Sequence, residues 1–252
     1  MKKHAGISIV AVLAVSGLAV DRADASAATV TGLDDFSIHT VGEGLFGPTR
    51  RNALDSRFQV NGRNPNTAER NYGLWTAFNI DGGSLFANPI SQLDSVEVNL
   101  FGANPITGQT VANVIRSGNF NVYFTENDDD VLLASNGYVW DINTPDGVGQ
   151  FADRVLVAST FLQAGDQDLT LSLDLSTIGS TLIDRINNGD LIRFIFTSDT
   201  MEFASSWGVG VPGTSTILAF DGPAPTVTFA VPAPGAAAML GLAGLMSARR
   251  RR

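Results

Sequence analysis

Carboxylates are the main side chains in this sequence that could do chemistry. The 252-residue chain contains 25 Asp and Glu, two His and no Cys. The lack of Cys excludes thiolate zinc sites, iron–sulfur clusters and cysteine nucleophiles. Beyond His4, the chain has only His39, and one histidine cannot form a histidine-clustered metal site. No Gly-x-Ser-x-Gly motif presents a serine for His39 to activate, so we predict no catalytic residues.

Two carboxylates about 5 to 10 Å apart would suffice for a glycosidase. The glutamates between the two ends are spread along the chain, at Glu43, Glu69, Glu97, Glu126 and Glu202. Nothing in the sequence brings a particular pair together, and surface carboxylates are normally solvated. The prediction is therefore a protein that is not an enzyme. A secreted glycosidase or lyase that uses two carboxylates on a polysaccharide is the alternative.

Calcium is the metal ion that the remaining side chains suit best. The run from Glu126 to Asp130 concentrates oxygen ligands in one loop, and we expect any structural calcium at Glu126, Asp128 and Asp130. A second acidic run, 141–147, departs from a calcium-binding loop because Pro145 interrupts it and the closing glutamate is missing. Such a turn forms by Asx hydrogen bonds without a metal. No other cofactor is expected.

Three tryptophans could stack on sugar rings if they were exposed. They are Trp75, Trp140 and Trp207. Core packing is the commoner fate of tryptophan in a strand, and we expect it for Trp75 and Trp207. Trp140 lies beside the Asp141 turn, so it is expected to be the most exposed of the three.

Alternation of apolar and polar residues predicts strands, each with one buried and one solvent-exposed face. The clearest runs are 95–100, 119–125, 168–175 and 192–197, and further candidates are 29–38, 72–80, 131–134, 154–161, 203–209, 216–220 and 226–230. Only 180–187 has a helical pattern, ended by Asn188-Gly189. We expect 43–71 to be a long, partly ordered loop. The resulting fold class is all-β: an antiparallel, jelly-roll-like β-sandwich with one short helix.

The N-terminus, residues 1–27, has the pattern of a secretory signal peptide. Lys2 and Lys3 precede the apolar run 5–20, and a polar stretch ends in Ala25-Ser26-Ala27. Small residues at Ala25 and Ala27 are what signal peptidase accepts, so we predict a signal helix that is removed after Ala27.

The C-terminus, residues 231–252, reads VPAPGAAAMLGLAGLMSARRRR. Prolines keep the first residues from being helical, and 235–248 is an uncharged apolar stretch. Fourteen helical residues span about 21 Å, less than the roughly 30 Å hydrocarbon core of a bilayer. The arginines Arg249, Arg250, Arg251 and Arg252 would stop this single transmembrane helix with its end in the cytoplasm. The segment is therefore expected to be a thin, temporary anchor, and the only membrane contact of the protein.

This tail resembles the PEP-CTERM sorting signal of exported bacterial proteins. The matching residues are Val231, Pro232, Ala233 and Pro234, the apolar run that follows, and the terminal arginines. Ala233 stands where the commonest form of the motif has Glu. The resemblance implies cleavage near the motif by an exosortase-type membrane protease, followed by release or transfer to the cell surface. It also implies an association with exopolysaccharide production.

The remaining body, 28–230, is expected to form one domain. Its strand order over 95–207, the short helix before the Gly189–Thr197 segment, and Phe203-Ala204-Ser205 in a closing strand resemble bacterial jelly-roll surface domains of the DNRLRE type. That resemblance implies a sandwich like those of carbohydrate-binding modules, and it assigns no site residue.

Charge adds a constraint on the partners of this body. It contains nine Arg, no Lys and 23 acids, which are the 25 of the whole chain without Asp21 and Asp24, so its formal charge is −14. Such a surface repels polyanions, which argues against nucleic acid as a partner. The overall prediction is an exported cell-surface or matrix protein with a structural or carbohydrate-adhesive role, whose partners are signal peptidase, an exosortase-type protease and exopolysaccharide.

Overall fold

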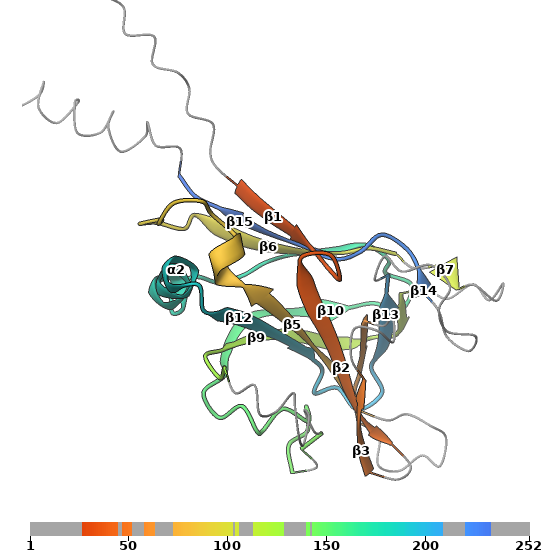
Figure 1. Cartoon of the computed structure of the whole chain (residues 1–252). Helices are drawn as coiled ribbons and strands as arrows, with labels where there is room; N and C mark the ends of the chain where they lie inside the picture. The colour runs from red at the N-terminus through yellow and green to blue at the C-terminus, as the bar shows by residue number, and fades with distance from the viewer. Residues whose placement is uncertain are drawn as a thin grey trace, which may run out of the picture. The chain divides into compact units, whose positions relative to one another are not determined.

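Two antiparallel β-sheets are the main regular structure of the described residues, so the all-β prediction is confirmed (Figure 1). The computed structural model describes residues 27–44, 47–51, 58–63, 73–102, 104–105, 113–128, 140–141, 143–208 and 220–232. They belong to one compact unit, Ser26–Pro232. The predicted signal helix, the predicted strand at 131–134 and the predicted transmembrane helix lie outside the described residues. Within the described part, no helix is long and apolar enough to span a membrane.

The smaller sheet has four strands in the order β1 (Ala27–Thr31), β15 (Thr226–Ala230), β6 (Ser95–Leu100) and β11 (Leu169–Ser172). Alternation is clearest in β6 and β15, where every second residue is buried, as for Val96, Val98 and Leu100 in β6. This sheet joins the first and last described strands of the chain, since β1 pairs with β15 along its whole length.

The larger sheet has nine strands. The main path runs β10 (Val155–Leu162), β9 (Gly118–Thr125), β12 (Leu191–Thr197), β5 (Leu74–Asp81), β4 (Phe58–Asn61), β13 (Ala204–Trp207) and β8 (Val114–Arg116). Off this path, β2 (Phe36–Gly44) pairs with β5 and with β3 (Gly47–Arg51). Two short strands, β7 (Asn104–Pro105) and β14 (Phe220–Asp221), pair separately. The turn after β10 bonds back to β8, where Gly165 N–H donates to Val114 C=O at 2.8 Å, so the sheet curls.

The main core lies between the two sheets and is rich in aromatic rings. Phe196 of β12 is central: its ring centroid lies 4.5 Å from that of Phe78, 5.1 Å from Phe58 and 6.0 Å from Phe120. Valines of the smaller sheet, such as Val98 and Val227, belong to the same buried cluster. Burial of this apolar surface is the main force that holds one sheet on the other.

One α-helix, α2 (Gly179–Asn188), covers one end of the core. It matches the predicted helix at 180–187, and Leu182 and Ile186 are its buried apolar residues. Gly189 ends it with φ 75°, the left-handed conformation that glycine adopts without a Cβ clash, and its N–H donates to Ile186 C=O. A 3-10 turn, η2 (Gly82–Ser84), follows β5.

The outer face of the larger sheet is covered over β5, β9 and β12, so the prediction of a solvent-exposed face is wrong for these strands. Arg193 and Thr197 of β12 and Thr125 of β9 are fully buried although they alternate with core residues. The reason is the segment 143–154, which packs over this face: Thr197 Oγ1 donates to Asp146 C=O at 2.7 Å. Val41, Trp75, Ala77, Ile195, Trp140, Val148 and Phe151 form a second buried apolar cluster there.

Two further expectations were wrong in detail. The predicted single strand at 29–38 is two strands, because a turn separates β1 from β2. In that turn Leu33 has φ 67°, and Asp35 Oδ2 accepts from Thr31 N–H at 2.8 Å. The predicted loop at 43–71 contains β3 and β4. β3 lacks an alternating pattern and β4 alternates over only four residues, and pairing with β2 and β13 supplies their partners.

Candidate functional site

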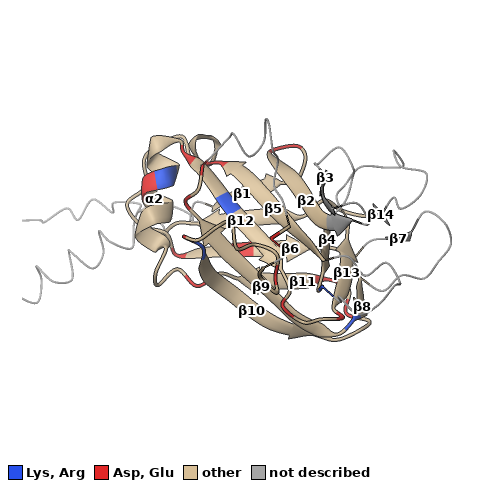
Figure 2. Ribbon diagram, turned by 90° about the horizontal axis from the view of Figure 1, so that it is seen from below, with Lys and Arg blue, Asp and Glu red and all other residues tan. Residues whose placement is uncertain are grey.

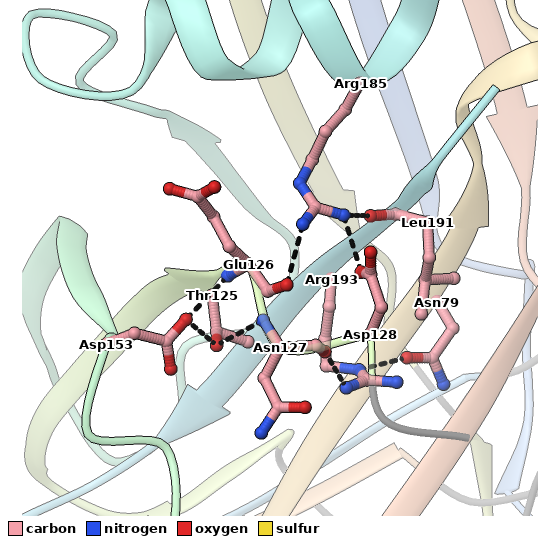
Figure 3. Close-up of polar contacts among 9 residues, drawn as sticks. All are labelled: Asn79, Thr125, Glu126, Asn127, Asp128, Asp153, Arg185, Leu191 and Arg193. Atoms are coloured by element: carbon pink, nitrogen blue, oxygen red, sulfur yellow. Dashed lines mark hydrogen bonds and ion pairs between the residues drawn. The ribbon is translucent and has the colours of Figure 1, made fainter. Parts of the chain in front are cut away.

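The acidic loop after β9, predicted as the calcium site, is held by two arginines from other elements (Figure 3). Arg185 of α2 donates from Nη1 to Asp128 Oδ1 at 2.5 Å and to Leu191 C=O at 2.5 Å. Its Nη2 donates to Glu126 C=O at 2.6 Å. One buried guanidinium therefore ties the helix, the start of β12 and this loop together.

Arg193 of β12 also binds the loop after β9. Its Nε donates to Asn79 Oδ1 at 2.7 Å, and its Nη1 donates to Asn127 C=O. The side chain is completely buried. The sequence pattern predicts Arg193 on a solvent-exposed strand face. Its role in binding the loop was missed because the segments that bury it are distant in sequence.

The carboxylates of this region are not gathered around a metal position. Asp128 faces the Arg185 guanidinium, and the exposed Glu126 side chain points away from Asp128 (Figure 3). Asp153 Oδ2 accepts from Thr125 Oγ1 at 2.7 Å and from Glu126 N–H at 2.8 Å. Asp130 lies outside the described residues. In the part of the chain that is described, no group of three or more acidic or histidine side chains is placed to hold an ion, and calcium binding stays a prediction.

The second acidic run forms an Asx turn, as its composition indicates. Asp141 Oδ1 accepts from the backbone N–H of Asn143 at 2.9 Å and from its side-chain amide at 3.1 Å. Thr144 Oγ1 then donates to Asp141 C=O. These hydrogen bonds are those of an Asx turn.

All three tryptophans are buried, and Trp140, expected to be the most exposed of them, is only 3% exposed. The Trp140 side chain packs on the outer face of the larger sheet, where a Cβ on Gly73 or on Gly147 would meet its ring at 2.2 or 2.4 Å. Gly147 also has φ +73°, so both its backbone conformation and the space taken by the Trp140 ring require glycine at this position. Buried indoles cannot stack on a sugar, so the described surface offers no tryptophan platform.

Arg154 helps to hold the segment 143–154 on the outer face of the larger sheet. Its guanidinium lies 5.4 Å from the Tyr123 ring centroid and forms an ion pair with Asp146 at 3.5 Å. Burial raises the pKa of the Tyr123 phenol above its usual value, and the negative charge of Asp146 adds to the rise while Arg154 opposes it. The arrangement fixes the 143–154 segment on the sheet.

The other predicted residues are scattered. His39 lies on β2, buried, with Nε2 3.1 Å from Ser37 Oγ. Glu202 is exposed in the turn before β13. Ala27 begins β1, opposite Ala230 at the end of β15, and Val231 is buried just beyond. Ala25, Ala233, Pro234 and the four terminal arginines lie outside the described residues, and Pro232 is the last described residue.

A cavity of about 290 Å³ lies beside the end of α2. Its lining residues are Gly83, Phe86, Ala87, Asn88, Pro89, Ile186, Asn187, Asn188 and Gly189. None carries a charge, and the Asn187 amide is already used to hold the backbone of Ile90 through two bonds of 2.8 Å. This cavity has no acid or base with which to catalyse hydrolysis.

The outer face of the smaller sheet is a regular array of short polar side chains, which we call the hydroxyl face. Strand pairing aligns two rows across β1, β15, β6 and β11. The rows are Thr29, Thr228, Glu97, Ser172 and Thr31, Thr226, Asn99, Thr170. Neighbours in a row are about 4.8 Å apart and the rows about 6.8 Å apart, the ordinary spacings of a sheet.

Hydrogen bonds within the rows orient the hydroxyl face. Thr29 Oγ1 lies 3.0 Å from Thr228 Oγ1, and Thr170 Oγ1 donates to Asn99 Oδ1 at 2.7 Å. Every member is exposed or half-exposed, and Glu97 is the one charged residue among the eight. The face therefore offers a dense set of neutral donors and acceptors to a partner.

These features define an antiparallel, β-sandwich-like protein with one covered sheet face and one even, hydroxyl-rich face. No family model matches the chain, and no similar curated protein is found for it.

Proposed function

We propose that the protein is an exported, non-enzymatic component of the cell surface or matrix, whose jelly-roll-like body adheres to exopolysaccharide through the hydroxyl face. The observation that carries this proposal is the alignment of eight polar side chains in two rows over four strands. Burial of the three tryptophans leaves no indole platform among the described residues, so the proposal rests on this polar array.

The chemistry of the hydroxyl face suits a neutral or weakly charged glycan. Seven of its eight side chains are Thr, Ser or Asn, which donate and accept hydrogen bonds without a counterion. A body with a formal charge of −14 repels strongly anionic polymers at moderate salt. Sugar hydroxyls can bond to such a face directly or through ordered water, which costs little affinity.

Removing hydroxyls from this face is expected to weaken glycan binding. In the double variant Thr29→Val and Thr228→Val, each substitution keeps the side-chain shape and removes hydrogen bonds worth about 1 kcal/mol, so the Kd should rise roughly thirtyfold. A glycan-array screen of 28–230 identifies the ligand, and calorimetric titration measures the Kd. Thr177→Val, at an exposed turn before α2, is the matched control. Equal loss in the control, or release of oligosaccharides from the polymer, would contradict the proposal.

The proposed route to the surface uses both ends of the chain. Signal peptidase would cleave after Ala27, and an exosortase-type protease would act near Val231, Pro232, Ala233 and Pro234. The PEP-CTERM resemblance supports this route, together with the strand pairing that ends at Ala27 and Ala230, next to both proposed cleavage regions.

Replacing all four terminal arginines, Arg249 to Arg252, with serine is expected to trap or mislocalise the precursor, because the apolar segment then lacks its cytoplasmic stop. Immunoblots of membrane and extracellular fractions should show at least a fivefold fall in processed protein. The matched control replaces the same arginines with lysine, which keeps the charge and should preserve processing. Unchanged processing of the serine variant would refute the assignment of the sorting signal.

A further inference from the structure

Strand β10 is an open edge of the larger sheet. Among the described strands it pairs on one side only, with β9. Figure 2 shows it along the border of the ribbon, tan over its whole length. Its sequence, Val-Leu-Val-Ala-Ser-Thr-Phe-Leu, contains no charged residue and no proline. An edge of this kind is a template on which another strand can pair.

Only the first part of β10 is protected. A register shift between Leu156 and Ala158 marks a bulge, and there Val157 C=O accepts from Asp174 N–H at 2.7 Å. Beyond Leu162 the chain turns toward β8, where Ala164 N–H donates to Ser117 Oγ at 2.8 Å. Between these points, over 158–162, alternate residues direct their N–H and C=O groups away from β9.

The side chains of the open edge are also unprotected. Phe161 is 57% exposed and Leu156 49%, two of the four large hydrophobic side chains that are exposed in the described structure. Edge strands in soluble proteins normally carry a lysine, a proline or a bulge that prevents pairing. The segment 158–162 has none of these, so the sequence leaves its pairing surface available.

We propose that β10 pairs with β10 of a second copy of this chain, antiparallel, to form a two-fold dimer with a continuous sheet. Antiparallel pairing of identical strands closes around a two-fold axis, so one contact satisfies both copies. The distribution of charge favours association at β10 over association at other parts of the surface. The body carries 23 acids against nine arginines, so most of its surface repels its own copy, whereas the eight residues of β10 carry no charge. The dimer does not depend on the proposed glycan binding.

The absence of cysteine allows a direct test on the full-length chain in mild detergent. A single introduced cysteine can form a disulfide only with another copy, because the natural chain contains no thiol. Diamide, which takes up the two electrons and two protons, oxidises the single variants Ser159→Cys, Thr160→Cys and Phe161→Cys. At least one should give at least five times more covalent dimer than Met201→Cys, the control at a residue 51% exposed in the turn before β13.

Sedimentation velocity provides the second readout. Phe161→Lys should raise the dimer dissociation constant at least about tenfold, because a charge then lies on the strand that pairs between the two copies. Met201→Lys, which removes similar exposed apolar surface elsewhere, should leave it unchanged. The dimer proposal is overturned if the chain stays monomeric over the accessible concentrations. A monomer is also the expected result if another segment of the same chain occupies the β10 edge. The proposal is equally overturned if both lysine variants weaken association alike, or if Met201→Cys cross-links as well as the β10 positions.

Discussion

Replacing Arg193 with methionine is expected to lower the free energy of unfolding by about 3 kcal/mol. The methionine fills most of the space, but Asn79 Oδ1 and Asn127 C=O lose the donors that Arg193 provides. An acceptor left without its donor in a buried position costs its full desolvation free energy. The loop after β9 should then separate from β12. Urea unfolding followed by tryptophan fluorescence measures the change.

The matched control for this prediction is Arg116→Met. Arg116 lies exposed at the end of β8, so the same substitution there should change stability by less than about 0.5 kcal/mol. A loss below about 1 kcal/mol for Arg193→Met would mean that the acceptors find other donors, and that the loop does not depend on this arginine.

Phe196→Ala is expected to be still more destabilising, by about 4 kcal/mol. The ring is completely buried and lies within 6.0 Å of three other rings, so its removal leaves a cavity that rigid strands cannot fill. Phe196→Leu keeps most of the volume and should cost about 1 kcal/mol. The unfolding midpoint in urea reports both.

Phe161→Ala is the control for this pair of variants, since the same atoms are removed from a side chain that is 57% exposed. It should change the free energy of unfolding of the monomer by less than about 0.5 kcal/mol, measured at dilute protein. A similar loss at both phenylalanines would contradict the location of the core between the two sheets.

Local alternation was sufficient to predict much of the fold. The runs that became β6, β9 and β12 have clear periods of two, and each has its apolar side in the core. The same pattern could not show what covers the other side. Arg193 and Thr197 are buried by chain segments that local periodicity does not connect to β12, so a covered sheet and a half-solvated sheet have the same sequence pattern.

The candidate sites show the same limit. Thr29-Val30-Thr31 and Thr226-Val227-Thr228 each have a visible alternation, yet only the strand pairing shows that they form one surface across 199 residues of sequence. Trp140 flanks a turn, a position that favours exposure, and it is buried because two glycines make room for its ring. Both outcomes depend on long-range contacts, which a local pattern does not contain.

The pairing of β1 with β15 also has a mechanical consequence. Ala27 lies opposite Ala230, so the chain enters and leaves the body at the same end of one strand pair. Tension applied between the two ends would separate these strands from that end, breaking their hydrogen bonds one after another rather than loading them all together. A body pulled by both ends would therefore yield at low force, whereas a body attached through a single end does not load this strand pair in that way.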